Sequence, residues 1–197
     1  MASTNKLNWC LVGLLLAAPA LPARAQAHPP KAPFFLTLHL AGGTGLVALG
    51  GGVRVAHERL EPEVLVGYLP RRLSGTKGLA IFTLKTTYLP WTPRFGDSRW
   101  HAAPLTLGAR LTYTTGQQFF LTAASSGRYQ PGYYWWSSAV RAGLLLGTRL
   151  GYQPSGGLRT ALYSELSTND LHLVSALTNR SLRLPEILTL GGGAKVR

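Results

Sequence analysis

The sequence has little cysteine, few acidic residues and, after its N-terminal segment, no long apolar run. Its single cysteine, Cys10, lies in a segment that we expect to be removed. Disulfide frameworks and thiolate metal sites are therefore excluded from the mature chain. No stretch after residue 25 approaches the roughly 18 consecutive apolar residues of a transmembrane helix, so a helical membrane protein is excluded as well.

The first 25 residues have the three parts of a secretory signal peptide. Lys6 gives a short positive region, residues 9–18 are apolar, and residues 23–25 (Ala-Arg-Ala) fit the small-x-small cleavage rule. An uncleaved anchor is the alternative, but about ten apolar residues are too few for a helix to cross a bilayer. We expect cleavage after this tripeptide, a flexible lead-in over residues 26–33, and one domain over residues 34–197.

Acidic residues are scarce, because the chain has 7 Asp and Glu against 20 Lys and Arg. Without Lys6 and Arg24, 18 basic residues remain against the same 7 acids. A strong basic excess is typical of nucleic-acid binding, but an exported protein seldom meets nucleic acid. We therefore predict no nucleic-acid partner, and expect the charges to contact anionic lipid headgroups or acids within the fold.

What the sequence has in abundance is alternation. In residues 139–152, Leu144 and Leu146 share one side, whereas Arg141, Arg149 and three glycines share the other. A period of two indicates a β-strand and not a helix. Eight segments alternate in this way: 34–42, 45–56, 61–70, 78–89, 104–114, 139–152, 158–167 and 186–197.

These segments are long and even in number. Each has about nine to fourteen residues, which suits a membrane strand of roughly 9–11 residues better than the soluble mode of about 5–6. Outer-membrane barrels have even strand numbers, short periplasmic turns and longer outer loops. With both termini periplasmic, the two longest loops face outward, and only residues 90–103 are long for a periplasmic turn. We predict an all-β fold: an eight-stranded antiparallel transmembrane up-and-down β-barrel.

Aromatic residues on the apolar sides are expected to form two girdles at the membrane interfaces. A soluble sandwich has no reason to place tyrosines at both ends of its hydrophobic face. The predicted girdle residues are Phe34, Tyr88 and Tyr152 near the periplasmic ends, and Tyr68, Tyr113 and Trp135 near the outer ends.

Charged residues fall on the opposite sides of the strands. A charge near the membrane midplane costs roughly 2–4 kcal/mol, so these sides are expected to face the lumen. Such a lumen is just wide enough for side chains, and simple packing, with the two acids bridged by arginines, is one interpretation. An anion site or a narrow pore is the other. The predicted lumen residues are Arg54, Glu63, Lys85, Arg110, Arg141, Arg149, Arg159, Glu165 and Lys195.

Two blocks carry a family resemblance: residues 129–136 (Tyr-Gln-Pro-Gly-Tyr-Tyr-Trp-Trp) and residues 165–171 (Glu-Leu-Ser-Thr-Asn-Asp-Leu). With them the chain resembles the small eight-stranded outer-membrane β-barrels of Gram-negative bacteria, and is similar to a Bacteroidetes-type family whose motifs carry no assigned chemistry. The likeness covers most of residues 34–197 and implies contact with outer-membrane lipid and lipopolysaccharide. One departure is the C-terminal Lys-Val-Arg, where such barrels usually have an aromatic residue that the insertion machinery reads.

A weaker resemblance is to lipid A deacylases, barrels of the same membrane with a Ser–His–Glu site. His172, Ser175 and Glu165 lie in a comparable region, and acyl hydrolysis needs a serine within reach of a histidine that a carboxylate orients. The spacing departs from the deacylase pattern His-x-Ser. On a strand His172 and Ser175 would point to opposite faces, whereas a helical turn would bring them together. The alternative is two ordinary polar loop residues.

These observations predict an outer-membrane protein, exported by a cleaved signal peptide, with a structural or surface-interaction role and no reaction. Loops 115–138 and 168–185 are the expected contact surfaces for a partner, and the aromatic cluster in the first loop stacks on sugars or anchors at the interface. A lipid A hydrolase and a soluble periplasmic lipocalin-like carrier are the alternatives. The histidines lack ligand spacing, and neither a metal nor a cofactor is predicted.

Overall fold

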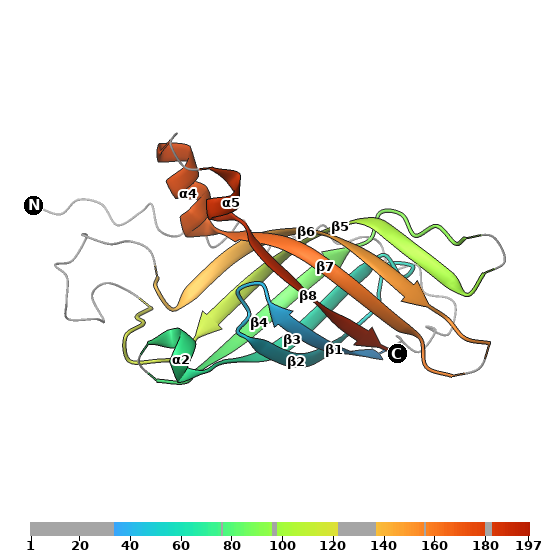
Figure 1. Ribbon diagram of the computed structural model, residues 1–197, viewed down its shortest axis with the longest axis horizontal. Helices are drawn as coiled ribbons and strands as arrows, with labels where there is room; N and C mark the ends of the chain where they lie inside the picture. Colours follow the sequence, from blue (N-terminus) through green and yellow to red (C-terminus); the bar gives the residue numbers. More distant parts are fainter. Residues whose placement is uncertain (1–33, 76, 96–97, 122–136, 156, 180–182) are drawn as a thin grey trace, which may run out of the picture. The chain divides into compact units, whose positions relative to one another are not determined.

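The computed structural model describes residues 34–75, 77–95, 98–121, 137–155, 157–179 and 183–197. In this part of the chain, eight antiparallel strands form a closed barrel (Figure 1). The strands are β1 (Phe34–Ala41), β2 (Val47–Val53), β3 (Leu60–Leu69), β4 (Leu79–Tyr88), β5 (Trp100–Thr114), β6 (Val140–Tyr152), β7 (Thr160–Asn169) and β8 (Thr189–Val196). The predicted all-β, eight-stranded antiparallel barrel is confirmed.

Each strand pairs with its neighbours in sequence, and the last strand closes on the first. The closing register runs from Leu36 opposite Val196 to Ala41 opposite Gly191. Closure satisfies the backbone hydrogen bonds that a sheet edge would leave open. Because the strand number is even, the first residue of β1 and the last residue of β8 lie at the same end of the barrel, which we call the terminal end.

In the described residues, three short helices lie at the opposite end, which we call the helical end (Figure 1). They are α2 (Arg71–Ser74), α4 (Asp170–Thr178) and α5 (Leu184–Ile187). The side chain of Asn169 accepts a hydrogen bond from the backbone N–H of His172 and so caps α4, the ordinary role of an N-cap asparagine. Among the described helices, none combines the length and the hydropathy that spanning a membrane requires.

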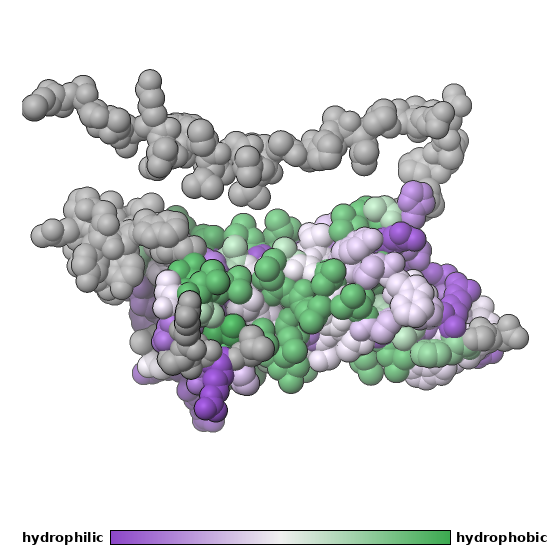
Figure 2. All heavy atoms as spheres, turned by 90° about the horizontal axis from the view of Figure 1, so that it is seen from above, coloured by the Kyte–Doolittle hydropathy of each residue, from purple (hydrophilic) through white to green (hydrophobic). Residues whose placement is uncertain are grey.

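The barrel wall has charged side chains inside and apolar side chains outside. Glu63 and Lys85 are each 1% exposed, whereas Leu36, Leu84 and Leu144 are 55–58% exposed. Figure 2 shows apolar side chains over the strands, with hydrophilic side chains gathered towards the ends. This distribution is the reverse of that in a soluble domain, where apolar residues dominate the buried positions.

Some inward positions nevertheless hold apolar residues. Phe35, Leu65 and Leu145 are buried, although they share their strand faces with charged or polar side chains. They fill the space between the polar groups, as expected for a lumen that is just wide enough for side chains.

Strand β5 begins earlier than the sequence predicted. Residues Trp100 to Ala103 already pair with β6, and the register shifts between Ala103 and Thr106. Pro104 lies in this shift. Proline has no N–H to donate to the ladder, so the alternation is interrupted there and the predicted strand began only at that residue. The connection predicted over residues 90–103 is correspondingly shorter.

The predicted girdle residues that the structure describes lie on the outer face near the strand ends. Tyr152 is half-buried against Trp100, with the ring centroids 4.9 Å apart. Trp135 lies outside the described residues. The others have exposed fractions of 40–59%: Phe34, Tyr68, Tyr88 and Tyr113.

Candidate functional site: a charged lumen and a basic cavity

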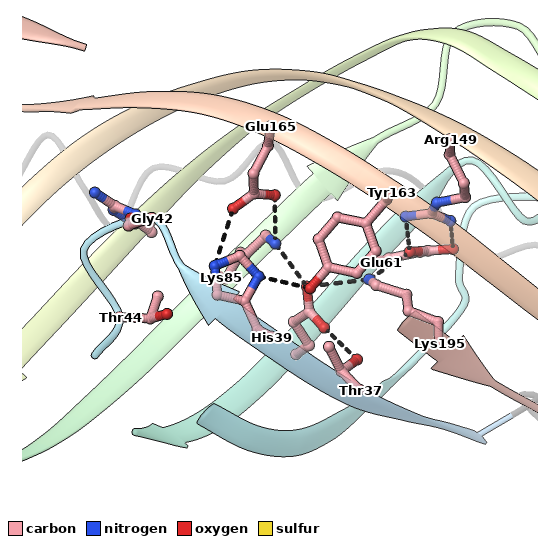
Figure 3. A network of polar contacts seen from close by, with 12 residues as sticks. Thr37, His39, Gly42, Thr44, Glu61, Lys85, Arg149, Tyr163, Glu165 and Lys195 are labelled. Carbon is pink, nitrogen blue, oxygen red and sulfur yellow. Dashed lines mark hydrogen bonds and ion pairs between the residues drawn. The ribbon is translucent and has the colours of Figure 1, made fainter. Parts of the chain in front are cut away.

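Charged side chains from five strands meet in the middle of the barrel (Figure 3). All of them are at most 4% exposed. Three are carboxylates and three are cations, so the cluster is balanced in formal charge. We call these six side chains the lumen network: Glu61, Glu63, Lys85, Arg149, Glu165 and Lys195.

Glu61 is the most heavily bonded acid of the lumen network. Its carboxylate accepts two hydrogen bonds from the guanidinium of Arg149, both at 2.7 Å. It accepts a third from Lys195 Nζ at 2.9 Å and a fourth from Arg54 Nε at 2.6 Å. A carboxylate bound in this way by a bidentate arginine and two further cations has its lone pairs satisfied, which is what allows it to be completely buried.

Glu63 links the two lysines of the lumen network. Lys195 Nζ donates to Glu63 Oε1 at 3.0 Å, and Lys85 Nζ lies 3.4 Å from the same oxygen. The second carboxylate oxygen accepts a hydrogen bond from the hydroxyl of Thr37 at 2.7 Å. The pairs around Glu61 and Glu165 therefore join into one connected set.

Glu165 completes the lumen network towards the helical end. Lys85 Nζ donates to Glu165 Oε2 at 2.7 Å, and His39 Nε2 lies 3.7 Å from Glu165 Oε1. The other ring nitrogen of His39 lies 2.7 Å from the hydroxyl of Tyr163. The amine of Lys85 also lies 4.8 Å from the centroid of the Tyr163 ring, a distance that favours a cation–π contact.

The lumen network closes the middle of the barrel. Water passing through a channel would leave the side chains along its path exposed. Leu65, His39 and Glu61 are instead 0% exposed. The lumen is thus filled at this level by paired charges and apolar side chains.

Glycines on the inner face make room for these large side chains. Gly193 lies opposite both His39 and Tyr163 in the strand register. A methyl group at this position would overlap the carbonyl oxygen of Leu38 and would lie 2.8 Å from the Tyr163 hydroxyl. Gly147 pairs with Glu165 in the same way. The alternation of glycine with long charged residues is therefore a packing requirement of the narrow lumen.

Arg110 fills the lumen nearer the helical end. Its guanidinium donates a hydrogen bond to the carbonyl oxygen of Gly42, and Ser167 Oγ donates to the same oxygen at 3.2 Å. Gly143 lies opposite Arg110, and a methyl group there would lie 3.1 Å from Arg110 Nε. The loop after β1 and the arginine thus hold each other in place.

A cavity of about 490 Å³ opens at the terminal end of the barrel, and we call it the basic cavity. Seven of its lining residues are Lys or Arg and one, Glu58, is an acid. Arg149 and Lys195 are shared with the lumen network and lie at the inner limit of the cavity. The remaining basic residues are Arg54, Arg59, Arg94, Arg159 and Arg197.

The acids near the basic cavity neutralise only part of this charge. Glu58 accepts a hydrogen bond from Arg197 Nη2 at 2.7 Å and lies 3.8 Å from Arg54 Nη1. The hydrogen bond from Arg197 lowers the pKa of Glu58, so that this carboxylate is ionised at neutral pH. By contrast, three cavity arginines form no ion pair with a carboxylate of the described residues, taking 4.0 Å between nitrogen and oxygen as the limit: Arg59, Arg94 and Arg159.

The turn between β2 and β3 holds Glu58 at the rim of the basic cavity by an uncommon backbone path. Ala56, His57 and Glu58 have φ angles of 50°, 57° and 65°. Non-glycine residues adopt this left-handed region at a cost of roughly 1–2 kcal/mol each. Three consecutive residues of this kind store backbone strain in the turn beside the basic cavity.

The structure divides the nine predicted lumen residues among three places. Arg54 and Arg159 line the basic cavity, and Arg110 and Arg141 lie towards the helical end. Arg141 is half-buried, with its Nη1 3.7 Å from Asp170 Oδ1. The remaining five belong to the lumen network: Glu63, Lys85, Arg149, Glu165 and Lys195.

Sequence reasoning missed three members of the interior. Glu61 was not assigned to the lumen, although it lies two residues before Glu63 and therefore shares its face. The sequence analysis assigns no role to His39 or to Tyr163, which the structure brings together in the lumen. Alternation could have placed all three side chains on the inner face. It could not have identified the residues they bond to, because those residues come from distant strands.

The residues considered for hydrolysis lie in two different environments. Glu165 is buried in the lumen network. His172 and Ser175 belong to α4, so a helical turn does bring them to one side, but His172 Nδ1 lies 3.3 Å from the carbonyl oxygen of Ile187. Among the described residues, no hydrogen bond joins His172, Ser175 and Glu165 into a catalytic set.

The two loops expected to contact a partner are described in part. Loop 115–138 has its middle, with the aromatic cluster, outside the described residues. Loop 168–185 contains α4, on which Leu171, Val174 and Leu177 are 38–83% exposed.

Comparison of the chain with protein-family models, with curated proteins and with solved structures found no match to any of the three. The functional argument therefore depends on the barrel, the lumen network and the basic cavity.

Proposed function

We propose that this protein is an integral outer-membrane β-barrel with a structural or surface-interaction role and no reaction of its own. The observation that carries the proposal is the inverted wall, with paired charges buried and leucines exposed around the closed barrel. In water, exposed apolar area of this extent is unfavourable, at about 25 cal/mol per Å². In contact with lipid acyl chains, the same apolar area carries no such cost.

The closed sheet supports a membrane location for a second reason. A chain in hydrocarbon must satisfy every backbone polar group internally, which only helices and closed barrels do. The aromatic residues at both ends of the outer face are placed as in membrane proteins, where amphipathic rings lie at the headgroup level. Even strand number and longer connections at one end are typical of outer-membrane barrels.

The filled lumen favours a structural or surface role over transport. The helical end carries the longest connections and, in the proposed orientation, faces outward. Its exposed α4 leucines and its loops 115–138 and 168–185 are then the surfaces offered to lipopolysaccharide or to a surface partner.

Fractionation of cells that express the full chain tests this proposal. We expect the mature chain in the outer-membrane fraction after carbonate washing, and a shift of its gel mobility on boiling, because folded barrels resist unfolding by detergent. Recovery in the aqueous fraction would overturn the proposal and favour a soluble periplasmic lipocalin-like carrier.

A second measurement separates the structural role from the hydrolase alternative. Mass spectrometry of lipid A from cells with and without the protein is expected to show one unchanged acyl pattern. Loss of an acyl chain only in the cells with the protein would replace the structural role by that of a lipid A hydrolase.

A further inference from the structure

The basic cavity holds more positive charge than the acids among the described residues neutralise. Three described acids pair with its cations: Glu58 and Glu61 are bonded to arginines, and Glu63 is bonded to Lys195. Arg59, Arg94 and Arg159 remain without an ion-pair partner among the described residues. Cations held close together without counter-charges repel each other, so the arrangement favours an anion from outside.

Donor atoms at the inner limit and the rim of the basic cavity support the same inference. Arg149 Nε and Arg197 Nη1 are buried and have no hydrogen-bond partner in the structure. Arg149 is 4% exposed, and its other guanidinium nitrogens are both bonded to Glu61. Buried donors of charged groups are normally satisfied, and both of these belong to residues that line the basic cavity.

We propose that the basic cavity binds a water-soluble polyanion that carries two or more phosphate groups. Guanidinium groups match phosphate oxygens in bidentate geometry, and three arginines without an ion-pair partner among the described residues call for more than one negative charge. A volume of about 490 Å³ lies within the range of small-molecule sites and exceeds what a single phosphate fills.

The position of the cavity favours a soluble ligand over a lipid headgroup. Phe35, Ala103 and Ala161 line the cavity and are at most 7% exposed, and they belong to the inner face of the wall. A lipid held by the outer face would have to bend around the strand ends to reach them. In the proposed membrane orientation this end faces the periplasm, but the binding itself depends only on the cavity residues.

The cavity arginines can be substituted without loss of backbone hydrogen bonds. Arg159 and Arg197 are held by two hydrogen bonds between their backbones, at 2.8 and 2.9 Å, which a side-chain substitution leaves intact. Arg94 is exposed. We therefore expect R94Q/R159Q to fold as the parent does, which circular dichroism and gel mobility verify.

The test is calorimetric titration of the full chain, refolded in zwitterionic detergent at low salt, with sodium tripolyphosphate. We expect one site per chain, with tripolyphosphate binding more tightly than inorganic phosphate. R94Q/R159Q is expected to weaken the binding about tenfold, because it removes two cations that each contribute about twofold to fivefold at this solvent-accessible site. The control is R71Q/R72Q, which removes two exposed arginines of α2 at the helical end and is expected to leave the affinity within about twofold.

Two outcomes would overturn the proposal: no saturable binding, or equal weakening in both double variants, which would mean general attraction to a basic surface. Arg59→Gln, on the exposed turn, is a second variant if R94Q/R159Q does not refold. It is expected to weaken binding about twofold to fivefold, and an unchanged affinity would contradict the proposal. Because the titration is made in detergent, its failure leaves the outer-membrane proposal standing.

Discussion

The lumen network and the basic cavity are built from the same kinds of residue but differ in balance. In the lumen network three carboxylates meet three cations, and all six side chains are at most 4% exposed. The basic cavity shares Arg149 and Lys195 with this network, and its other five Lys or Arg residues, all arginines, meet one lining acid, Glu58, in a space open to solvent. In the lumen network each buried charge has a partner of opposite sign, since an unpaired buried charge costs several kcal/mol; the buried Arg110 is bonded instead to the carbonyl oxygen of Gly42. The excess of arginine is held where water or a ligand can reach it.

Glu61→Gln is expected to have the largest effect on stability, because it removes one carboxylate from the charge-balanced lumen network. Arg149 and Lys195 would lose a charged partner while they remain buried. Removing one member of a buried ion pair costs about 3–5 kcal/mol. The measurement is the free energy of unfolding of the detergent-refolded chain in guanidinium chloride.

Glu58→Gln is the matched control for this substitution. It also removes a carboxylate that binds two arginines, but Glu58 is 52% exposed, and surface ion pairs contribute at most about 1 kcal/mol. Equal losses of stability in the two variants would show that burial does not distinguish the lumen network from the basic cavity.

Gly193→Ala tests whether the lumen network is tightly packed, in contrast to the open basic cavity. A methyl group would overlap Leu38 and press on Tyr163, and overpacking of this kind costs about 1–3 kcal/mol. Gly157→Ala, on the β6–β7 turn, is not a useful control because its φ is 128°. Denaturant unfolding provides the measurement, and a loss below about 0.5 kcal/mol would mean that the lumen is loosely filled.

Only part of this arrangement could be predicted from the sequence. The alternation fixed the number and order of the strands and the inward side of residues such as Lys85 and Arg149. It also placed the tyrosines at the strand ends. The periodicity carries this information because each strand of a barrel has one wet or polar side and one apolar side.

Other features depend on contacts that alternation does not encode. Alternation predicts the start of β5 wrongly because Pro104 interrupts the ladder. It also predicts an eighth segment from Glu186, whereas the structure has α5 there and begins β8 at Thr189. The cavity arginines Arg59, Arg94 and Arg197 come from turns and the chain end, and no periodic signal connects these segments.

His57→Gly tests whether the turn at the basic cavity is strained. His57 has a φ of 57°, and glycine relieves this left-handed strain. We expect a gain of up to about 1 kcal/mol in the free energy of unfolding, whereas no relief of this kind is available in the lumen network. A loss of stability would show that the imidazole itself stabilises the turn.

Arg159→Gln is expected to have the smallest effect on stability. The side chain has no ion-pair partner among the described residues, so its loss removes repulsion from the other cavity arginines and only a weak, longer-range attraction to Glu58. The free energy of unfolding should change by at most about 0.5 kcal/mol, without a ligand present. A loss comparable with that in Glu61→Gln would mean that the cavity arginines are structural.

We propose that the apolar outer face contacts lipid while the charges pair inside, and arginine substitutions at two leucines test this proposal. Leu146 lies in the middle of the wall, paired with Leu107 and Leu166, whereas Leu158 lies in the turn at the terminal end. The measurement is the free energy of unfolding of L146R and L158R in phospholipid vesicles. We expect a loss of about 2–4 kcal/mol for L146R and at most about 1 kcal/mol for L158R, because the cost of arginine depends on membrane depth. Both leucines are exposed, at 48% and 67%, so equal and small losses would contradict the claim.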